Sequence, residues 1–182
     1  MTFLDFFAGV GGFRCGLEQA GFKCLGFIEK DKFAVKSYRA MHDTKDEFYA
    51  DDIQTVRASG LPNADIWTAG FPCQDISSAG KQLGFAGKRS SLFFEVTRLL
   101  QEIEQKPRFI VLENVRGLLS VNRGRDFARV LVELDKVGYD IEWDCLQTSD
   151  FGLPQNRERV FIVGHLRGGS SRKIFPLRKT SA

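Results

Sequence analysis

Apolar positions along this chain follow two spacings: short unbroken runs, and sets of residues three or four apart. The runs predict strands over Thr2–Phe6, Phe22–Ile28, Asp65–Ala69, Phe109–Leu112, Tyr139–Leu146 and Arg159–Val163. The wider spacing predicts helices before Ala20, over Lys32–Met41, through Leu92, Val96, Leu99 and Ile103, and through Phe127, Val130, Leu131 and Leu134. Strands that alternate with helices predict an α/β layered fold with a mostly parallel sheet, and the last two strands are expected to pair as an antiparallel hairpin at its edge.

The chemically distinctive residues of the chain follow the predicted strands. They are Gly9–Gly12, Glu29, Asp52, the Pro72-Cys73 pair and Glu113 with Asn114. Ligands of open α/β sheets bind at the carboxyl ends of the strands. The pattern therefore places the candidate binding and catalytic residues together at one edge of the sheet.

Length and composition exclude several classes of protein. A chain of 182 residues with 43% hydrophobic and 27% charged residues has the make-up of one soluble globular domain. No apolar run approaches the roughly 20 residues of a membrane-spanning helix, and no secretory signal is recognisable at the start. The four cysteines form no C-x-x-C pair, which argues against a zinc site and against a disulfide framework. We therefore expect a cytoplasmic protein without a metal.

The net charge of +3 is unevenly placed. Five of the 26 basic residues lie between Arg167 and Ala182, where there is no acid, which leaves 21 basic against 23 acidic residues elsewhere. A basic tail can follow a phosphate backbone. The alternative is a solvated terminus with no partner.

The glycine-rich turn after the first strand is the first candidate binding element. Glycines let a backbone approach a ligand closely, and the following helix begins with free N–H groups. A dinucleotide fingerprint would place a third glycine where this chain has Arg14, which counts against a nicotinamide enzyme. Glu29, at the end of the second strand, suits either a ribose hydroxyl or a helix cap.

Two residues near later strand ends are candidates for chemistry. Cys73 follows proline after a buried strand and precedes the loop-like segment Asp75–Ser91, so it is a candidate nucleophile. The alternative for Cys73 is a small buried hydrophobic residue. Glu113 ends a strongly apolar strand at the same edge, either as a reacting carboxylate or as a helix cap.

Gln155, Arg157 and Arg159 are alternate residues of the chain, and the last predicted strand begins at Arg159. Alternate residues of a strand point to one face, so we expect the three side chains to share one side. Two guanidinium groups on one face could clamp an anion or a carbonyl oxygen. The alternative is an edge strand that is protected by charge.

Taken together, these motifs resemble those of cytosine-5 DNA methyltransferases. The residues that carry the resemblance, in the family's order and approximate spacing, are Phe7-Ala8-Gly9-Val10-Gly11-Gly12, Glu29, Asp52-Ile53, Pro72-Cys73-Gln74, Glu113-Asn114-Val115 and Gln155-x-Arg157-x-Arg159. Each motif is weak or moderate alone, but the set is specific and extends from Phe3 to about Val163. The resemblance implies a Rossmann-like, S-adenosylmethionine-dependent methyltransferase domain over residues 1–166, followed by a basic tail over residues 167–182.

The resemblance implies that S-adenosylmethionine binds over the glycine-rich turn. Glu29 would hold its ribose and Asp52 would lie near its adenine amino group, with Lys30 where the family often has a bulky residue. The implied cofactor residues are Phe7, Gly9, Gly11, Gly12, Glu29, Lys30, Asp52, Ile53, Pro72 and Leu92. For Leu92, a place in the core of a helix fits equally.

The same resemblance implies a covalent mechanism on cytosine. Cys73 would attack C6 of the ring, and Glu113 would hydrogen-bond N3 and the exocyclic amino group. Arg159 would contact O2 of the base and favour the thiolate, and Arg157 would orient the site. Because C5 of cytosine is hidden in the stacked duplex, the base must be flipped out. A lid after Cys73 would then close over the target. Its implied DNA contacts are Ser77, Lys81, Gln82, Lys88 and Arg89.

The later elements of the family, a variable target-recognition domain and an Asn-Ser-Val-type motif, are absent from this sequence. A second subunit or a C-terminal portion is therefore expected to supply target recognition, with the basic tail leading toward it. Duplex DNA is the expected substrate. Two alternatives remain open: a related enzyme that acts on RNA cytosine, and an inactive fragment that binds the cofactor or DNA.

Overall fold

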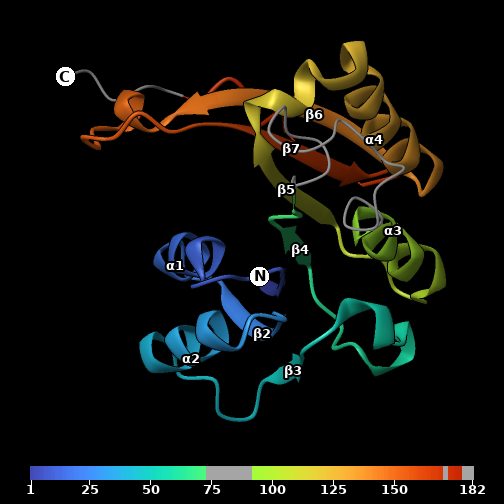
Figure 1. The fold of residues 1–182 in the computed structure, drawn as a ribbon. Coiled ribbons are helices and arrows are strands. Elements are labelled where there is room, and N and C mark those ends of the chain that lie inside the picture. The colour runs from blue at the N-terminus through green and yellow to red at the C-terminus, as the bar shows by residue number, and fades with distance from the viewer. Residues whose placement is uncertain (73–91, 170–171, 178–182) are drawn as a thin grey trace.

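The computed structural model describes residues 1–72, 92–169 and 172–177. Within these ranges the strands are β1 (Thr2–Phe6), β2 (Lys23–Ile28), β3 (Phe48–Ala50), β4 (Ile66–Ala69), β5 (Phe109–Val115), β6 (Tyr139–Gln147) and β7 (Glu158–Leu166). The α-helices are α1 (Gly12–Gln19), α2 (Lys32–Met41), α3 (Leu92–Glu102) and α4 (Arg125–Lys136). The strands form one twisted sheet with helices on both of its faces (Figure 1).

The strand order is β3-β2-β1-β4-β5-β7-β6. Neighbouring strands from β3 to β5 are parallel, and β7 runs antiparallel to both β5 and β6. The predicted α/β fold with a mostly parallel sheet and an antiparallel edge hairpin is therefore confirmed. The chain leaves β1 toward β2 and returns on the other side at β4, so the carboxyl ends of β1 and β4 flank a topological switch point, where such sheets bind ligands.

Both faces of the sheet are apolar, as expected for parallel strands that helices cover. On one face, Trp67 and Leu4 pack with buried residues of α3 and α4, among them Leu99 and Leu134. On the other face, α1 and α2 cover smaller clusters that include Tyr38. The two helix pairs lie on opposite sides of the sheet in Figure 1.

The start of α2 shows how local sequence fixes an element. The Asp31 carboxylate accepts hydrogen bonds from the backbone N–H groups of Phe33 and Ala34, at 2.7 and 3.0 Å. These donors have no partner within the helix, so an Asp at this position satisfies them. Because Asp31 directly follows Glu29 and Lys30, this cap also fixes the backbone positions from which those two side chains project.

The observed strands differ from the predicted ones at several ends, and two of the differences bear on the site. The strand β3 was not predicted, because its three residues are too few to show a period. The strand β5 runs to Val115, three residues beyond the apolar run that predicted it, because β7 continues to pair with it through the register pairs Glu113–Phe161 and Val115–Arg159. Glu113 therefore lies within a strand and not after one.

Part of the basic tail follows the edge of the sheet. The backbone N–H groups of Ile174 and Phe175 donate to the Glu142 carboxylate on β6, at 2.9 to 3.1 Å. The residues described from this tail are thus attached to the domain. No helix in the described ranges has both the length and the apolar character needed to cross a membrane.

Candidate active site

The loop after β1 has an unusual backbone that brings it close to the switch point. Phe7 has a φ of 55°, which is rare for a residue with a side chain, and Gly9 and Gly11 have φ of 58° and 91°. Such conformations persist only where their surroundings fix them, and they are common at ligand sites. The glycine-rich turn singled out from the sequence is therefore a tight, specifically shaped loop at the carboxyl end of β1.

Glu29 braces this loop from the neighbouring strand. One carboxylate oxygen accepts a hydrogen bond from the Gly9 N–H at 2.8 Å, and the other accepts from the Asp31 N–H at 2.7 Å. A carboxylate offers about four acceptor positions, so capacity remains for a ligand hydroxyl. Glu29 acts as a backbone brace in addition to any contact it makes with a ligand.

A cavity of about 290 Å³ opens between this loop and the ends of β2 and β4. Seven of the ten residues implied for the cofactor line it: Phe7, Glu29, Lys30, Asp52, Ile53, Pro72 and Leu92. Its remaining lining residues are Ile28, Asp51 and Gly70. Residues that are distant in the sequence thus meet in one hollow with apolar walls and carboxylates at its rim.

Lys30 and Asp52 form an ion pair on the wall of this cavity. The ammonium nitrogen lies 2.5 Å from one carboxylate oxygen, and the other oxygen accepts from the Gln54 N–H at 3.0 Å. The hydrogen bond from Lys30, and then the one from Gln54, lower the pKa of Asp52 below its ordinary value. The cavity therefore carries an ionised carboxylate whose partner is Lys30.

A second cavity of about 400 Å³ continues from the first across the switch point. The two share Phe7 and Gly70. The further lining residues of the second cavity are Ala8, Val10, Gly12, Phe13, Glu113, Arg157 and Phe161. A side chain at position 70 would meet the Glu113 carboxylate, because a Cβ placed there would lie 3.7 Å from Oε2. The cleft thus runs from the carboxylates of the first cavity to Glu113.

Glu113 is held by two arginines. Arg159 Nε lies 2.9 Å from Glu113 Oε1, and Arg157 Nη2 lies 3.3 Å from the same oxygen. The side chain of Arg159 is 23% exposed and that of Arg157 is 48% exposed, so Arg159 is the better shielded partner. The antiparallel pairing of β7 with β5 brings these groups together from positions more than 40 residues apart.

The expected common strand face of Gln155, Arg157 and Arg159 is wrong in part. The strand β7 begins at Glu158, so Gln155 and Arg157 precede it. The Gln155 N–H donates to the Leu153 carbonyl at 2.8 Å, which belongs to the turn between β6 and β7. The two arginines still converge on Glu113, because Arg157 reaches it from the end of that turn.

A third cavity of about 300 Å³ lies on the other side of the arginines. It is mostly apolar, with Glu113, Arg157 and Arg159 at one wall and Phe151 and Leu177 among the rest. Arg157 and Glu113 therefore line both this cavity and the second one. Within the described ranges, no group of His, Cys, Asp and Glu side chains is arranged to hold a metal ion.

The sequence matches the family of C-5 cytosine-specific DNA methylases over residues 1–181. The chain belongs to this family. Type II methyltransferase M.NlaX of Neisseria lactamica is 42% identical over 165 residues, which are 90% of this chain and 51% of that protein. Type II methyltransferase M.BsuFI of Bacillus subtilis is 40% identical over 164 residues, which are 90% of this chain and 39% of that protein. The chain thus spans about half, or less, of the length of these curated relatives.

Solved structures of methyltransferases have the same fold. The Entamoeba histolytica methyltransferase EhMeth superposes with a TM-score of 0.78 at 21% identity, over 100% of this chain and 57% of that chain. The Dnmt2 methyltransferase of S. pombe superposes with a TM-score of 0.74 at 22% identity, over 96% of this chain and 53% of that chain. At these identities the likeness establishes the fold of this DNA methylase family member.

The candidate nucleophile of this methylase family member, Cys73, lies outside the described residues. So do the DNA contacts implied for the lid, namely Ser77, Lys81, Gln82, Lys88 and Arg89. The segment that leads to Cys73 is nevertheless fixed at Phe71, whose carbonyl accepts a hydrogen bond from the Asn114 side-chain amide at 3.0 Å. Phe71 also packs against Phe93 of α3, with ring centroids 5.3 Å apart.

Asn114 is a residue whose part in the site the sequence did not reveal. It is 2% exposed and joins β5 to the segment before Cys73. The sequence marked Asn114 as part of the Glu113-Asn114-Val115 motif and as a side-chain amide in an otherwise apolar strand, but gave it no role. Buried polar groups are nearly always hydrogen-bonded, so the amide pointed to a partner without naming it.

Proposed function

We propose that this chain is the catalytic part of an enzyme that transfers a methyl group to C5 of a cytosine flipped out of duplex DNA. The observation that carries this proposal is the Glu113 carboxylate, held by Arg157 and Arg159 where two cavities meet. One cavity leads toward the residues implied for the cofactor, and the other is an open apolar hollow. Membership of the C-5 cytosine-specific DNA methylase family supports the same reaction.

The first cavity suits the adenosine part of S-adenosylmethionine. Carboxylates at Glu29 and Asp52 would accept from hydroxyl and amino groups, and Phe7, Ile53, Pro72 and Leu92 supply apolar walls. A Cβ placed on Gly9 or Gly12 would meet no atom within 4 Å, so these glycines leave room for a ligand to approach the backbone of the loop. When bound, S-adenosylmethionine supplies an electrophilic methyl group.

The protein's own groups would act on the cytosine ring. The Cys73 thiolate forms a bond to C6, and the electron pair released into the ring makes C5 nucleophilic. Glu113 hydrogen-bonds N3 and the exocyclic amino group, and Arg159 contacts O2 and favours the thiolate. After C5 has gained the methyl group and lost its proton, the C6–S bond breaks and the thiolate leaves.

Recognition of DNA would require more than residues 1–166. The segment Ser77–Arg89 would close over the flipped base through its phosphate contacts, and residues 167–182 would lead toward a second subunit or a C-terminal portion. The chain's span of about half its relatives supports this division. Base edges in the major groove would be read by that other part.

The test is transfer of labelled methyl from S-adenosylmethionine to mixed-sequence duplex DNA. The chain is assayed alone and with a second part taken from a relative, and a parallel assay uses tRNA. Cys73→Ala should abolish label, and Glu113→Gln should lower the rate by about 100-fold or more, since acid–base groups contribute about 10²–10⁴. Label that goes to tRNA alone would replace DNA by RNA as the substrate.

Two matched variants control for general damage. Cys145→Ala removes a half-buried thiol on β6, and Glu133→Gln removes a carboxylate whose partner is Lys136 on α4. Both should retain the wild-type rate. Unchanged transfer by Cys73→Ala would contradict the covalent mechanism, and no transfer under any condition would leave a protein that only binds the cofactor or DNA.

A further inference from the structure

His42 lies behind the glycine-rich loop. It caps the carboxyl end of α2, and its side chain is 7% exposed. The ring nitrogen Nε2 lies 3.3 Å from the carbonyl oxygen of Val10. A carbonyl oxygen only accepts, so Nε2 is the donor in this contact. Sequence reasoning assigned His42 no role, because nothing nearby in the chain shows that α2 ends beneath this loop.

The ring fills the space beside Gly11. A Cβ placed on Gly11 would lie 2.4 Å from His42 Nε2 and 3.0 Å from a ring carbon of Tyr38. The φ of 91° at Gly11 also disfavours a side chain. Val10 and Gly12 line the second cavity, and His42 does not. The histidine therefore supports the loop from a position outside the cleft that the loop borders.

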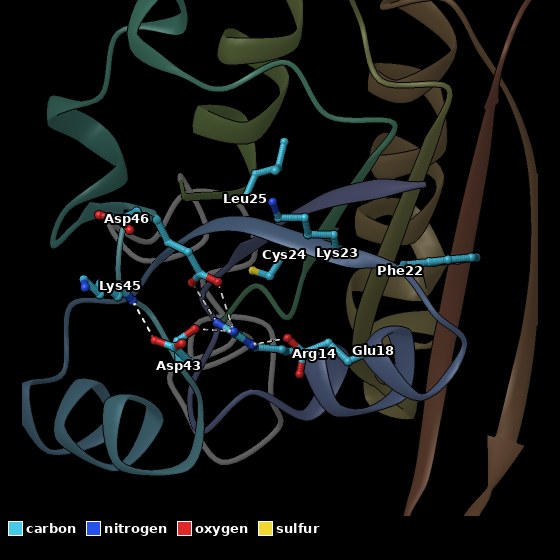
Figure 2. A pocket seen from close by; sticks show the side chains of 10 residues that line it. Arg14, Glu18, Phe22, Lys23, Cys24, Leu25, Asp43, Lys45 and Asp46 are labelled. Atoms are coloured by element: carbon cyan, nitrogen blue, oxygen red, sulfur yellow. Dashed lines mark hydrogen bonds and ion pairs between the residues drawn. The ribbon is translucent and has the colours of Figure 1, made fainter.

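Arg14 fixes the chain segment that continues from His42. Its Nη2 donates to the Asp43 carbonyl at 2.8 Å, and its Nη1 lies 2.8 Å from Glu47. Its Nε donates to Glu18 at 2.8 Å. Figure 2 shows the Arg14 side chain extending from α1 toward Glu18 and Asp43. Arg14 thus ties the helix that follows the loop to the segment that follows His42.

This arginine is 4% exposed and pairs with two carboxylates, so its charge is compensated within the protein. Arg14 borders a hollow of about 520 Å³. Each nitrogen of its guanidinium group already has a partner within the protein. Arg14 occupies the position of the third glycine in a dinucleotide fingerprint. Its contacts give that position a structural purpose, namely to hold α1 and the 43–47 segment together.

We infer that His42 is a positioning residue, which holds the Val10–Gly11 peptide in the shape that binds the cofactor, with Arg14 fixing His42's segment from behind. The cofactor part of this inference rests on the proposed function. The loop part does not, because it concerns only the shape of residues 7–12. A loop that already has its bound shape loses less conformational freedom when the ligand binds. Loss of that preorganised shape therefore weakens the affinity for the ligand.

The test compares two variants of His42. His42→Leu keeps apolar volume and removes the donor, whereas His42→Gln retains an N–H that can reach the Val10 carbonyl. His165 is the only other histidine of the chain and pairs with Glu142 on β6, so His165→Gln is the matched control. Amide hydrogen exchange of Gly9 and Gly11 and calorimetric titration with S-adenosylmethionine are measured for all three variants and for the wild type.

Loss of one hydrogen bond should speed loop exchange and weaken cofactor binding by about five- to tenfold in His42→Leu. Both values should stay within about twofold of wild type in the other two variants. In His42→Leu, amide exchange in strand β6 should stay at the wild-type rate, whereas a general loss of stability would speed it.

Three results would overturn the inference. The first is wild-type loop exchange in His42→Leu, and the second is a His42→Gln variant as impaired as His42→Leu. The third is faster loop exchange with an unchanged dissociation constant, which would break the link to the cofactor. If the wild type does not bind S-adenosylmethionine, the cofactor part of the proposed function fails, while hydrogen exchange still decides the role of His42 in the loop.

Discussion

Asp5 is a carboxyl group buried in the middle of the sheet. It lies on β1, two residues before Phe7, and has no exposed surface. Thr68 on β4 donates to Oδ1 at 2.7 Å, and Oδ2 has no hydrogen-bond partner among the described residues. Burial raises the pKa of Asp5 to about 7, and Glu29 adds to the shift, while the Thr68 hydrogen bond and Arg14 oppose it. The group therefore titrates near neutral pH at the base of the glycine-rich loop.

The stability of the protein should carry a pH dependence that Asp5→Asn removes. The folded pKa lies above the unfolded value of 3.8, so the folded state binds the extra proton between about pH 4 and pH 7. The stabilising contribution is complete below that window and is lost as the pH rises through the folded pKa. Asn imitates the protonated carboxyl and does not titrate, so the Asp5→Asn variant should gain stability relative to the wild type as the pH rises.

Urea unfolding at several pH values measures this effect. The wild-type free energy of unfolding minus that of Asp5→Asn should fall by up to about 1.4 kcal/mol per pH unit within the window and level off above it. Titrations of other groups are common to both proteins and cancel. A difference that is constant from pH 5 to pH 8 would contradict a raised pKa at Asp5.

For single residues, the sequence indicated which ones lie at the carboxyl ends of the strands but not what their side chains contact. Glu29 and Glu113 follow or end predicted strands, so their place was predictable, whereas the strand before Asp52 was not predicted. That Glu29 holds the Gly9 N–H, or that Lys30 pairs with Asp52, depends on distances between separate segments. Spacing along one chain carries no information on such contacts.

Among the elements, the outer strand β3 depends on a missing side chain in β2. A Cβ placed on Gly26 would lie 2.5 Å from the Phe48 carbonyl oxygen and 2.6 Å from the Phe48 Cβ. Real Cβ atoms do not approach other atoms so closely, so the strands would have to separate. Gly26 therefore permits the pairing that ends near Ala50 and, just beyond, Asp52.

Gly26→Ala should destabilise the fold by about 1–3 kcal/mol, as overpacking in a tight interior does. Gly16→Ala is the matched control, because a Cβ on that residue of α1 meets no atom within 4 Å. Alanine in a helix should raise stability there by about 0.5–1 kcal/mol. Chemical denaturation of both variants gives the comparison, and an equal effect at the two glycines would refute the close approach of β3 to β2.

Helices and long strands could be predicted from the sequence because each repeats its period several times. The first strand was predicted with its observed bounds, Thr2–Phe6, and α2 with its bounds Lys32–Met41. The extension of β5 to Val115 could not be predicted, because its last residues pair with β7 and contribute no apolar run of their own. The alternation of elements predicted the layers, but not the order in which the strands lie.

For the whole molecule, the described residues form a seven-stranded sheet and border a cleft, whereas the curated relatives are about twice as long or longer. We expect the chain alone to bind duplex DNA with little preference for sequence. Contacts to phosphates give affinity without discrimination, and base edges must be read in a groove. Adding a second part from a relative should create preference for one sequence.

The prediction is tested by measuring affinities for duplexes of different sequence by fluorescence anisotropy at two salt concentrations. The chain alone should bind all of them within about threefold and more weakly at higher salt, since counterions are released on binding. Each mismatched base pair should cost about 1–3 kcal/mol once a reading part is present. Discrimination by the chain alone would show that residues 1–182 already read bases.

The reversed direction of β7 determines which residues can reach the edge of the sheet at which the parallel strands end and Glu113 lies. From a parallel strand, only residues that come after it reach the edge; from β7, the residues that come before it do, as Arg157 does. The turn of residues 148–157 can therefore grow or shrink without altering any crossover helix. Insertions there would present new groups beside Glu113, so variation in what this sheet offers a substrate should concentrate ahead of β7.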